Sequence, residues 1–181
     1  MALTTYTVGE VLTAASLNDN LAYAVTVPAS TPPTFAIFNE TQASGTNSGT
    51  SVANAWTKRI LNTTNVNTIS DCSIASSVIT LGAGTYSVIA TAPFYQSTQT
   101  KIRLQNTTDA TTEIIGTSTY SATNTISFTN NLIGQFIIAG TKNFELQYYV
   151  KAAFASEGLG VKSSITSTSE VYGIIQIQKV G

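Results

Sequence analysis

Histidine is absent from the 181-residue chain, and cysteine occurs once, at Cys72. Without histidine the chain has no Ser-His or Cys-His nucleophile pair, and it lacks the side chain that most often ligates transition metals. A lone cysteine cannot form a disulfide within the chain, so we expect Cys72 to be a small buried side chain. These absences predict that the protein is not an enzyme and that it binds no cofactor and no metal ion.

Charged residues are also scarce, at 9% of the chain, with a net charge of −1. The acidic residues are scattered, so no catalytic carboxylate pair is apparent, and a polysaccharide depolymerase is the least favoured function. The one basic pair, Lys58-Arg59, is expected at a solvated strand end. So few positive charges predict that the chain binds no nucleic acid and is not attracted to an anionic membrane.

Long apolar runs are missing as well. No stretch approaches the roughly 20 apolar residues that span a bilayer, so we expect no membrane insertion. The first residues lack the basic region and the apolar run of a secretory signal. The sequence therefore predicts a chain that is made in a reducing cytosol or is indifferent to redox state.

Hydrophobic residues nevertheless make up 43% of the chain, and many of them are β-branched or aromatic. This composition predicts a folded chain rather than a disordered one. In the clearest stretch, Tyr86, Val88, Ala90 and Ala92 alternate with hydroxyl residues, and Ile89 is the one apolar exception on the polar side. Such alternation predicts a strand with one face in a core.

The same alternation recurs along the chain, most cleanly at Phe144, Leu146, Tyr148 and Val150. Strand segments are predicted at residues 35–38, 55–61, 81–93, 101–105, 113–120, 125–128, 132–138, 143–151 and 171–178. About eight to ten strands with turn signals and no helices between them predict an all-β fold, an antiparallel jelly-roll sandwich.

The first 27 residues differ from this pattern, because Leu17, Leu21 and Val25 recur at the spacing of one helix face. A helix this short is marginal on its own, so its apolar stripe must pack on something. We favour packing against symmetry mates or a neighbouring protein. Packing on its own domain is the alternative.

Residues 28–34 contain three of the chain's four prolines. Proline stiffens the chain and fits neither a helix interior nor a central strand. We therefore predict three parts: an anchoring segment with a short helix at 1–27, a linker at 28–34 and a head domain at 35–181.

The run Tyr6-Thr-Val-Gly-Glu-Val-Leu-Thr-Ala-Ala-Ser-Leu-Asn18 resembles a short N-terminal segment of many bacteriophage tail-fibre and other virion appendage proteins. That segment has an aromatic residue, a glycine with an acidic or polar neighbour, and a Thr-Ala-Ala-x-Leu/Val-Asn helix start. The resemblance implies attachment to a viral particle, or trimerisation on it. It also implies that the chain is located in the virion after synthesis in the host cytoplasm.

The head domain resembles the trimeric jelly roll shared by tumour necrosis factor, the globular heads of complement proteins and many phage fibre tips. The matching residues are Gly84-x-Tyr86-x-Val88 after a turn, the strands at 101–104 and 144–150, and the terminal Ile175-x-Ile177. This resemblance implies a threefold assembly in which aromatic and aliphatic residues line the axis.

Three apolar side chains, Tyr149, Tyr172 and Ile174, fall on the strand face that points away from the predicted core, with Val171 and Ile175 on the core side. Apolar residues on that face often mark a second buried interface. We predict that Tyr149, Tyr172 and Ile174 line the trimer interface. A monomer with some exposed tyrosines is the alternative.

The function expected from these features is that of a non-enzymatic, trimeric phage virion protein. It is a tail-fibre or appendage tip that binds other virion proteins through its N-terminal segment and recognises the host surface, with a surface glycan as its ligand. Tyr95, Tyr120 and Phe154 are aromatic candidates for stacking on sugars. The alternative is a structural protein that decorates or cements the capsid and recognises no host.

Overall fold

The computed structural model describes residues 8, 13–15, 17–18, 32–121 and 126–180. The chain divides into two compact units, Met1–Pro32 and Pro33–Gly181. The first strand begins at Thr34, directly after the prolines of the predicted linker.

In the first unit the described residues Ala14, Ala15, Leu17 and Asn18 are helical. The amide of Leu17 donates a hydrogen bond to the carbonyl of Thr13 at 3.1 Å, as in an α-helical turn. The Leu17 side chain is 52% exposed. Leu21 and Val25, which were predicted to lie on the same apolar helix face as Leu17, are outside the described residues. No helix in the described part of the chain is long and apolar enough to cross a lipid bilayer.

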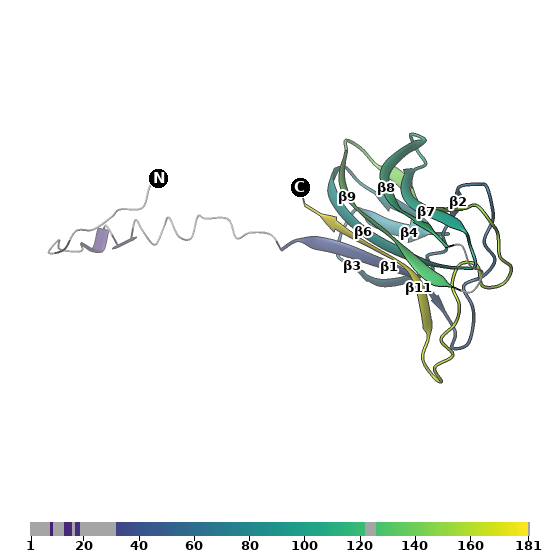
Figure 1. The fold of residues 1–181 in the computed structure, drawn as a ribbon. Helices are drawn as coiled ribbons and strands as arrows, with labels where there is room; N and C mark the ends of the chain where they lie inside the picture. Colours follow the sequence, from purple (N-terminus) through teal and green to yellow (C-terminus); the bar gives the residue numbers. More distant parts are fainter. Residues whose placement is uncertain (1–7, 9–12, 16, 19–31, 122–125, 181) are drawn as a thin grey trace. The chain divides into compact units, whose positions relative to one another are not determined.

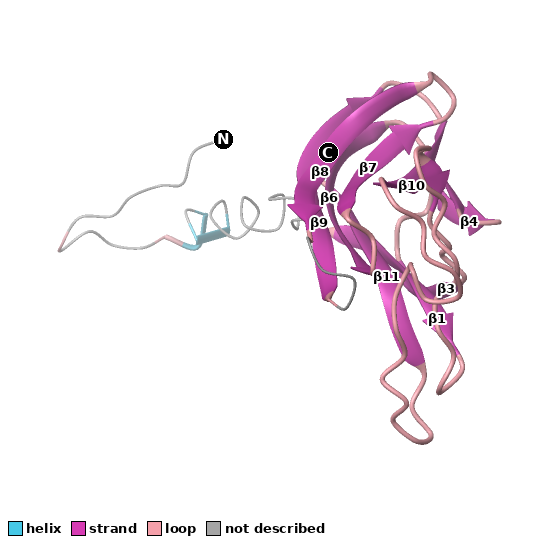
Figure 2. Ribbon diagram, turned by 45° about the vertical axis from the view of Figure 1, so that its right-hand side comes forward, coloured by secondary structure: helices cyan, strands magenta, loops and turns pink. Residues whose placement is uncertain are grey.

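The second unit is a sandwich of two antiparallel sheets (Figures 1 and 2). Sheet A has the order β3-β1-β11-β6-β9, and sheet B has the order β4-β5-β10-β7-β8 with β2 paired to β10. The strands of sheet A are β1 (Thr34–Gln42), β3 (Thr63–Asn67), β6 (Gly84–Tyr95), β9 (Ser127–Ile138) and β11 (Glu170–Lys179). Those of sheet B are β2 (Thr57–Lys58), β4 (Cys72–Ala75), β5 (Val78–Leu81), β7 (Gln99–Asn106), β8 (Thr111–Tyr120) and β10 (Lys142–Val150).

The predicted alternation is confirmed at the centre of both sheets. Tyr86, Val88, Ala90 and Ala92 of β6 point into the core, whereas Ile89 is exposed on the other face. On β10 the four predicted core residues are buried as well, and they face the sheet A residues across the sandwich. Burial of this many apolar side chains supplies most of the driving force for folding.

Two predicted strand boundaries are wrong. The segments 125–128 and 132–138 belong to one strand, β9, which pairs with β6 without interruption from Ser127 to Ile138. The predicted strand at 55–61 is reduced to the two residues of β2. Asparagine between apolar runs suggested a turn, but here Asn130 lies in the strand and its side chain is satisfied in the interior.

A register shift between β1 and β11 changes which residues face outward near the start of β11. Asn39 pairs with Ile174 and Thr41 pairs with Val171, so two residues of β11 lie opposite Glu40 alone. Such a bulge reverses the alternation beyond it. As a result Val171 is exposed, which corrects its predicted place in the core.

Long loops gather at one end of the sandwich and tight turns at the other. The long loops, residues 43–56 and 151–169, lie beyond the end of β1 and the start of β11 (Figure 2). They are joined by backbone hydrogen bonds, such as Ser48 N to Gly160 O at 3.1 Å and Leu159 N to Gly49 O at 3.1 Å. The chain enters the sandwich at the opposite end, where Thr34 pairs with Lys179.

Arg59 is fully buried, so the predicted solvated strand end is wrong for this residue. Its Nε lies 3.0 Å from Oε2 of Glu40, which is also fully buried, and its guanidinium donates a hydrogen bond to the carbonyl of Leu159. Burial raises the pKa of Glu40 and lowers that of Arg59, while the attraction between the pair opposes both shifts. The pair joins β1 of sheet A to the segment after β2 of sheet B.

Candidate functional site

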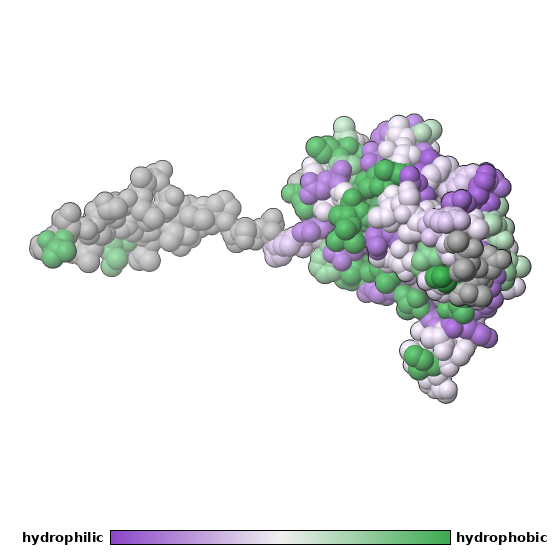
Figure 3. All heavy atoms as spheres, in the orientation of Figure 1, coloured by the Kyte–Doolittle hydropathy of each residue, from purple (hydrophilic) through white to green (hydrophobic). Residues whose placement is uncertain are grey.

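The outer face of sheet A is uncharged and rich in isoleucine along its last two strands. Neither β6 nor β9 contains an Asp, Glu, Lys or Arg residue. Ile89 and Ile133 are paired across these strands, and Ile174 lies on the neighbouring β11. Ile133 and Ile137 are 71% and 76% exposed. We call Ile89, Ile133, Ile137 and Ile174 the isoleucine face; hydrophobic side chains gather over β6 and β9 in Figure 3.

The apolar surface continues around the edge of the sandwich onto β8. A shallow hollow of about 310 Å³ between β8 and β9 is lined by Ile115, Gly116, Thr117, Asn131 and Ile133. The two strands approach so closely that a Cβ on Gly116 would lie 2.7 Å from the Asn131 carbonyl oxygen. Glycine is therefore required for this edge to close.

In contrast to β6 and β9, the outer face of sheet B carries charged side chains, together with aromatic ones. The Arg103 guanidinium lies over the Trp56 ring at 4.2 Å from its centroid, and Tyr149 meets the same ring edge-on at 5.6 Å. Arg103 is further fixed by bonds from Nε and one terminal nitrogen to Oε1 of Gln147, at 2.9 and 2.7 Å. We call Trp56, Lys101, Arg103 and Tyr149 the aromatic-basic face.

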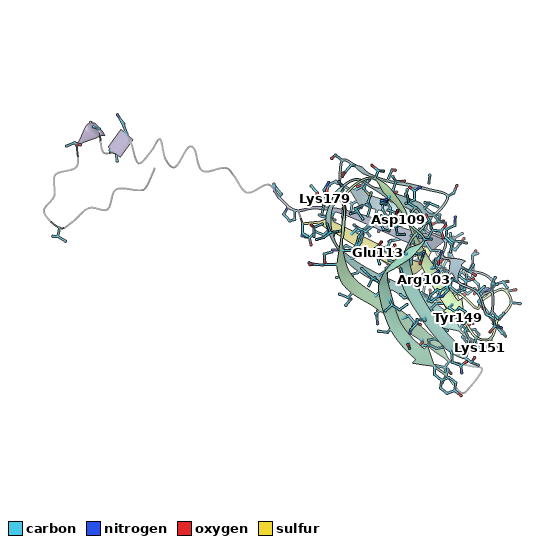
Figure 4. The ribbon with its side chains drawn as sticks, turned by 90° about the horizontal axis from the view of Figure 1, so that it is seen from above. Arg103, Asp109, Glu113, Tyr149, Lys151 and Lys179 are labelled. Atoms are coloured by element: carbon cyan, nitrogen blue, oxygen red, sulfur yellow. The ribbon has the colours of Figure 1, made fainter. Side chains whose placement is uncertain are left out.

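A depression of about 390 Å³ opens on this face, near the long loops. It is lined by Gln99, Thr100, Lys101, Ser118, Thr119, Tyr120 and Tyr149. Lys101 pairs with Tyr149 on one side and with Ser118 on the other, and Gln99 pairs with Tyr120. Figure 4 shows Tyr149 and Lys151 together toward one end of the unit, with Arg103 further along. We call this hollow the Tyr149 depression.

The floor of the Tyr149 depression is held from the other sheet. Asn130 of β9 is fully buried, and its Oδ1 accepts hydrogen bonds from the hydroxyls of Thr100 at 2.6 Å and Thr119 at 3.0 Å. Its Nδ2 donates to the carbonyl of Thr117 at 2.5 Å. A buried amide with these partners fixes the positions of β7 and β8.

At the end of the sandwich that carries the two long loops, the carboxylate of Glu170 accepts hydrogen bonds from both loops. Glu170 accepts hydrogen bonds from the amide and hydroxyl of Ser163 at 3.0 and 2.8 Å, from the Ser164 amide at 2.9 Å and from the Gly45 amide at 3.2 Å. These bonds, led by that from the Ser163 amide, lower the pKa of Glu170 to about 2. Glu170 therefore stays ionised and holds both long loops.

The structure separates the three residues predicted for the trimer interface. Ile174 is exposed on the isoleucine face, whereas Tyr149 lies on the aromatic-basic face of the other sheet. Tyr172 is only 6% exposed, and its hydroxyl donates to the Thr46 carbonyl at 2.7 Å. Burial raises its pKa to about 12. Its predicted interface role is therefore corrected, because loops of its own chain already cover it.

Sequence reasoning missed Trp56, Lys101 and Arg103. Lys101 and Arg103 alternate with the core residues of β7, so the strand pattern already placed both on one outer face. The pattern could not reveal Trp56, which reaches this face from a loop. Of the aromatic candidates for sugar stacking, Tyr120 lines the Tyr149 depression, while Tyr95 and Phe154 form an edge-to-face pair at 5.8 Å among the loops.

The described residues offer few side chains suited to metal binding or nucleophilic catalysis. Among the described residues, no three His, Cys, Asp or Glu side chains come together in a way that could hold a metal ion. Cys72 is buried, as predicted, and burial raises the pKa of its thiol to about 11. A thiol with so high a pKa is a poor nucleophile near neutral pH.

Comparisons with known proteins bear on the fold. No protein-family model matches the chain, and no curated protein matches it in sequence. The crystal structure of murine APRIL matches with a TM-score of 0.53 at 9% identity, over 82% of this chain and 100% of that one. The globular domain of zebrafish complement 1qA protein matches with a TM-score of 0.50 at 13% identity, over 83% and 97%. These matches confirm the predicted all-β, antiparallel jelly roll and its likeness to tumour necrosis factor and complement heads.

Proposed function

We propose that the chain is a non-enzymatic, homotrimeric virion protein of a bacteriophage, an appendage tip whose head recognises the host surface. The observation that carries this proposal is the contrast between the isoleucine face and the aromatic-basic face. The first is suited to burial against copies of the chain, and the second is suited to contact with a ligand in solvent.

Self-association is supported by the absence of charge on β6 and β9. Two identical surfaces that carry net charge repel each other, whereas a neutral apolar surface does not. β9 ends the strand order of sheet A, but β8 already packs against its edge. The outward face of β9 therefore remains to be covered, and a second copy of the chain would cover it.

A closed ring is favoured over a twofold dimer because the apolar surface covers both a sheet face and the adjoining edge. The isoleucine face lies on sheet A, and Ile115 extends it past Ile133 onto the β8–β9 edge. Packing the edge of one copy against the face of the next is a heterologous contact, which closes into a ring when the rotation permits. The resemblance of the head to trimeric jelly rolls supports three copies.

Attachment to the particle is assigned to the N-terminal segment, on the resemblance of Tyr6 to Asn18 to phage appendage proteins. The chain enters the head at the end opposite the long loops. An anchor at Thr34 therefore leaves the loops and the neighbouring Tyr149 depression free to meet a cell.

The first test is the mass of the purified chain by native mass spectrometry at micromolar concentration. We expect three copies of the 19.0 kDa chain. The second test adds the purified trimer to phage and host cells, where it should compete with the phage for adsorption. A monomer contradicts the assembly, and a trimer that fails to compete favours the capsid-decorating alternative over host recognition.

A further inference from the structure

The Tyr149 depression combines one exposed and one half-buried tyrosine, Tyr120 and Tyr149, with side chains that form hydrogen bonds. Tyr120 is 67% exposed, and the Tyr149 ring is supported from the side by Trp56. Gln99 and Ser118 are exposed between them. Aromatic faces pack against the apolar C–H face of a sugar ring, and amides and hydroxyls bond its hydroxyl groups. A volume of about 390 Å³ suits a small number of sugar rings.

The depression also has a definite charge. Its lining contains Lys101 and no Asp or Glu residue. Within the part of the chain that the structure describes, no carboxylate pairs with Lys101, whereas Lys58 lies 3.8 Å from Glu145 further along the sheet. Lys151 is exposed beside it and Arg103 is the next outward residue of β7. An ammonium that has no carboxylate partner, in a hollow also lined by Tyr120 and Tyr149, favours an anionic ligand.

The site is largely formed before any ligand arrives. Asn130 fixes the floor through Thr100 and Thr119, and Arg103 holds the Trp56 ring that supports Tyr149. A preformed site loses less conformational entropy on binding than a mobile loop does. The residues that line the depression come from β7, β8 and β10, three neighbouring strands of sheet B.

We propose that the Tyr149 depression binds an anionic sugar residue of a cell-surface glycan, with the ring against Tyr149 and Tyr120 and the acidic group at Lys101. This inference rests on the proposed function, since it names the ligand class of the head. The acidic group can be a carboxylate or a phosphate or sulfate ester, because all three accept hydrogen bonds from an ammonium.

The test applies the full-length chain to an array of oligosaccharides that carry glucuronic acid, phosphate esters or sulfate esters. The carboxyl-reduced and unesterified forms of the same oligosaccharides are included. We expect binding to at least one acidic oligosaccharide, and at least tenfold weaker binding to its neutral counterpart. Whichever acidic series binds identifies the acidic group.

Variants of the chain then locate the site. Lys101→Gln and Ser118→Asp should each weaken binding about tenfold or more, by removing the cation or by placing a carboxylate opposite the anion. Tyr149→Ala should weaken binding of acidic and neutral forms alike. Lys162→Gln, which removes one charge from an exposed loop position outside the depression, is the matched control and should bind normally. Melting temperatures establish that each variant is folded.

The proposal is overturned if no acidic oligosaccharide binds, if neutral forms bind equally well, or if Lys101→Gln behaves like Lys162→Gln. Its failure is separable from that of the proposed function. A trimer that blocks phage adsorption but binds no acidic oligosaccharide keeps the host-recognition function and removes this site. A chain that binds acidic oligosaccharides through Lys101 but is monomeric keeps the site and removes the assembly.

Discussion

The two outer faces of the sandwich are built from different kinds of residue. On sheet A the outward positions of β6 and β9 carry isoleucine, threonine and amides and no charge. On sheet B the outward positions of β7 and β10 include Lys101, Arg103, Glu145 and Tyr149. A sheet that packs on a single side requires one apolar face. A second apolar face on the same sheet therefore indicates a further buried contact.

Under the proposed function, this contrast assigns assembly to one face of the jelly roll and recognition to the other. Charge is excluded from the face assigned to identical copies and is kept, with aromatic rings, on the face assigned to a ligand. The core between them is shared, so each face can be altered while the other is left intact.

The buried ion pair that joins the two sheets gives the largest effect. Arg59→Met leaves Glu40 buried without its partner and should lower the free energy of unfolding by about 3–5 kcal/mol. Urea denaturation at a fixed protein concentration measures the change. The double variant Arg59→Met/Glu40→Leu should recover much of the loss, since no buried charge then remains. If the single variant is as stable as the parent, the pair does not hold the layers together.

The isoleucine face comes next. Ile133→Asp combined with Ile137→Asp should convert the proposed trimer into monomers, because each isoleucine that becomes buried in the interface contributes about 1.5–3 kcal/mol and the new charges repel. Native mass spectrometry should then show the 19.0 kDa chain alone. Ser73→Asp adds a charge on sheet B and should leave the trimer intact. An unchanged trimer in the double variant would place the interface elsewhere.

The β8–β9 edge should show a moderate effect. Gly116→Ala forces a Cβ against the Asn131 carbonyl and the Ile102 side chain, each 2.7 Å away. Overpacking of this kind costs about 1–3 kcal/mol, visible as a lower melting temperature. Gly140→Ala is the control, since no atom lies within 4 Å of a Cβ there. Equal melting temperatures for both variants would show that the edge is open in solution.

The smallest effect concerns the loop end and pH. The folded-state pKa of Glu170 is about 2, below its ordinary value of 4.5. A lowered pKa means that this carboxylate stabilises the fold above about pH 4.5 and that its contribution is lost as the pH falls toward 2. Melting temperatures of the parent and of Glu170→Gln should differ at pH 7 and converge at low pH. A constant difference across this range would contradict the assignment.

Local alternation was sufficient to predict the centre of each sheet. It identified the buried residues of β6, β7 and β10 and singled out Ile89 as an outward apolar residue. It failed at Val171, because a bulge depends on what the partner strand offers. It also failed at Tyr172, since only the folded loops show that Thr46 and Gly160 cover the ring.

In the candidate site, the outward position of the β7 residues could be predicted from the sequence. The residues that contact them from other parts of the chain could not. Lys101 and Arg103 follow the same alternation as Ile102 and Leu104. Trp56 joins them from a distant loop, and Asn130 reaches their strand from the opposite sheet. Contacts between residues far apart in the chain leave no periodic signal.

By itself the sequence determined that this chain folds as β-structure and that its charged side chains are few, with none on β6 or β9. Those properties depend on residue type and on a period of two, which a single strand already expresses. Only the tertiary structure decided that Ile174 and Tyr149 face opposite sides and that Arg59 is buried against Glu40. The physical reason is that burial and pairing depend on which strands become neighbours, and strand order is a property of the whole sandwich.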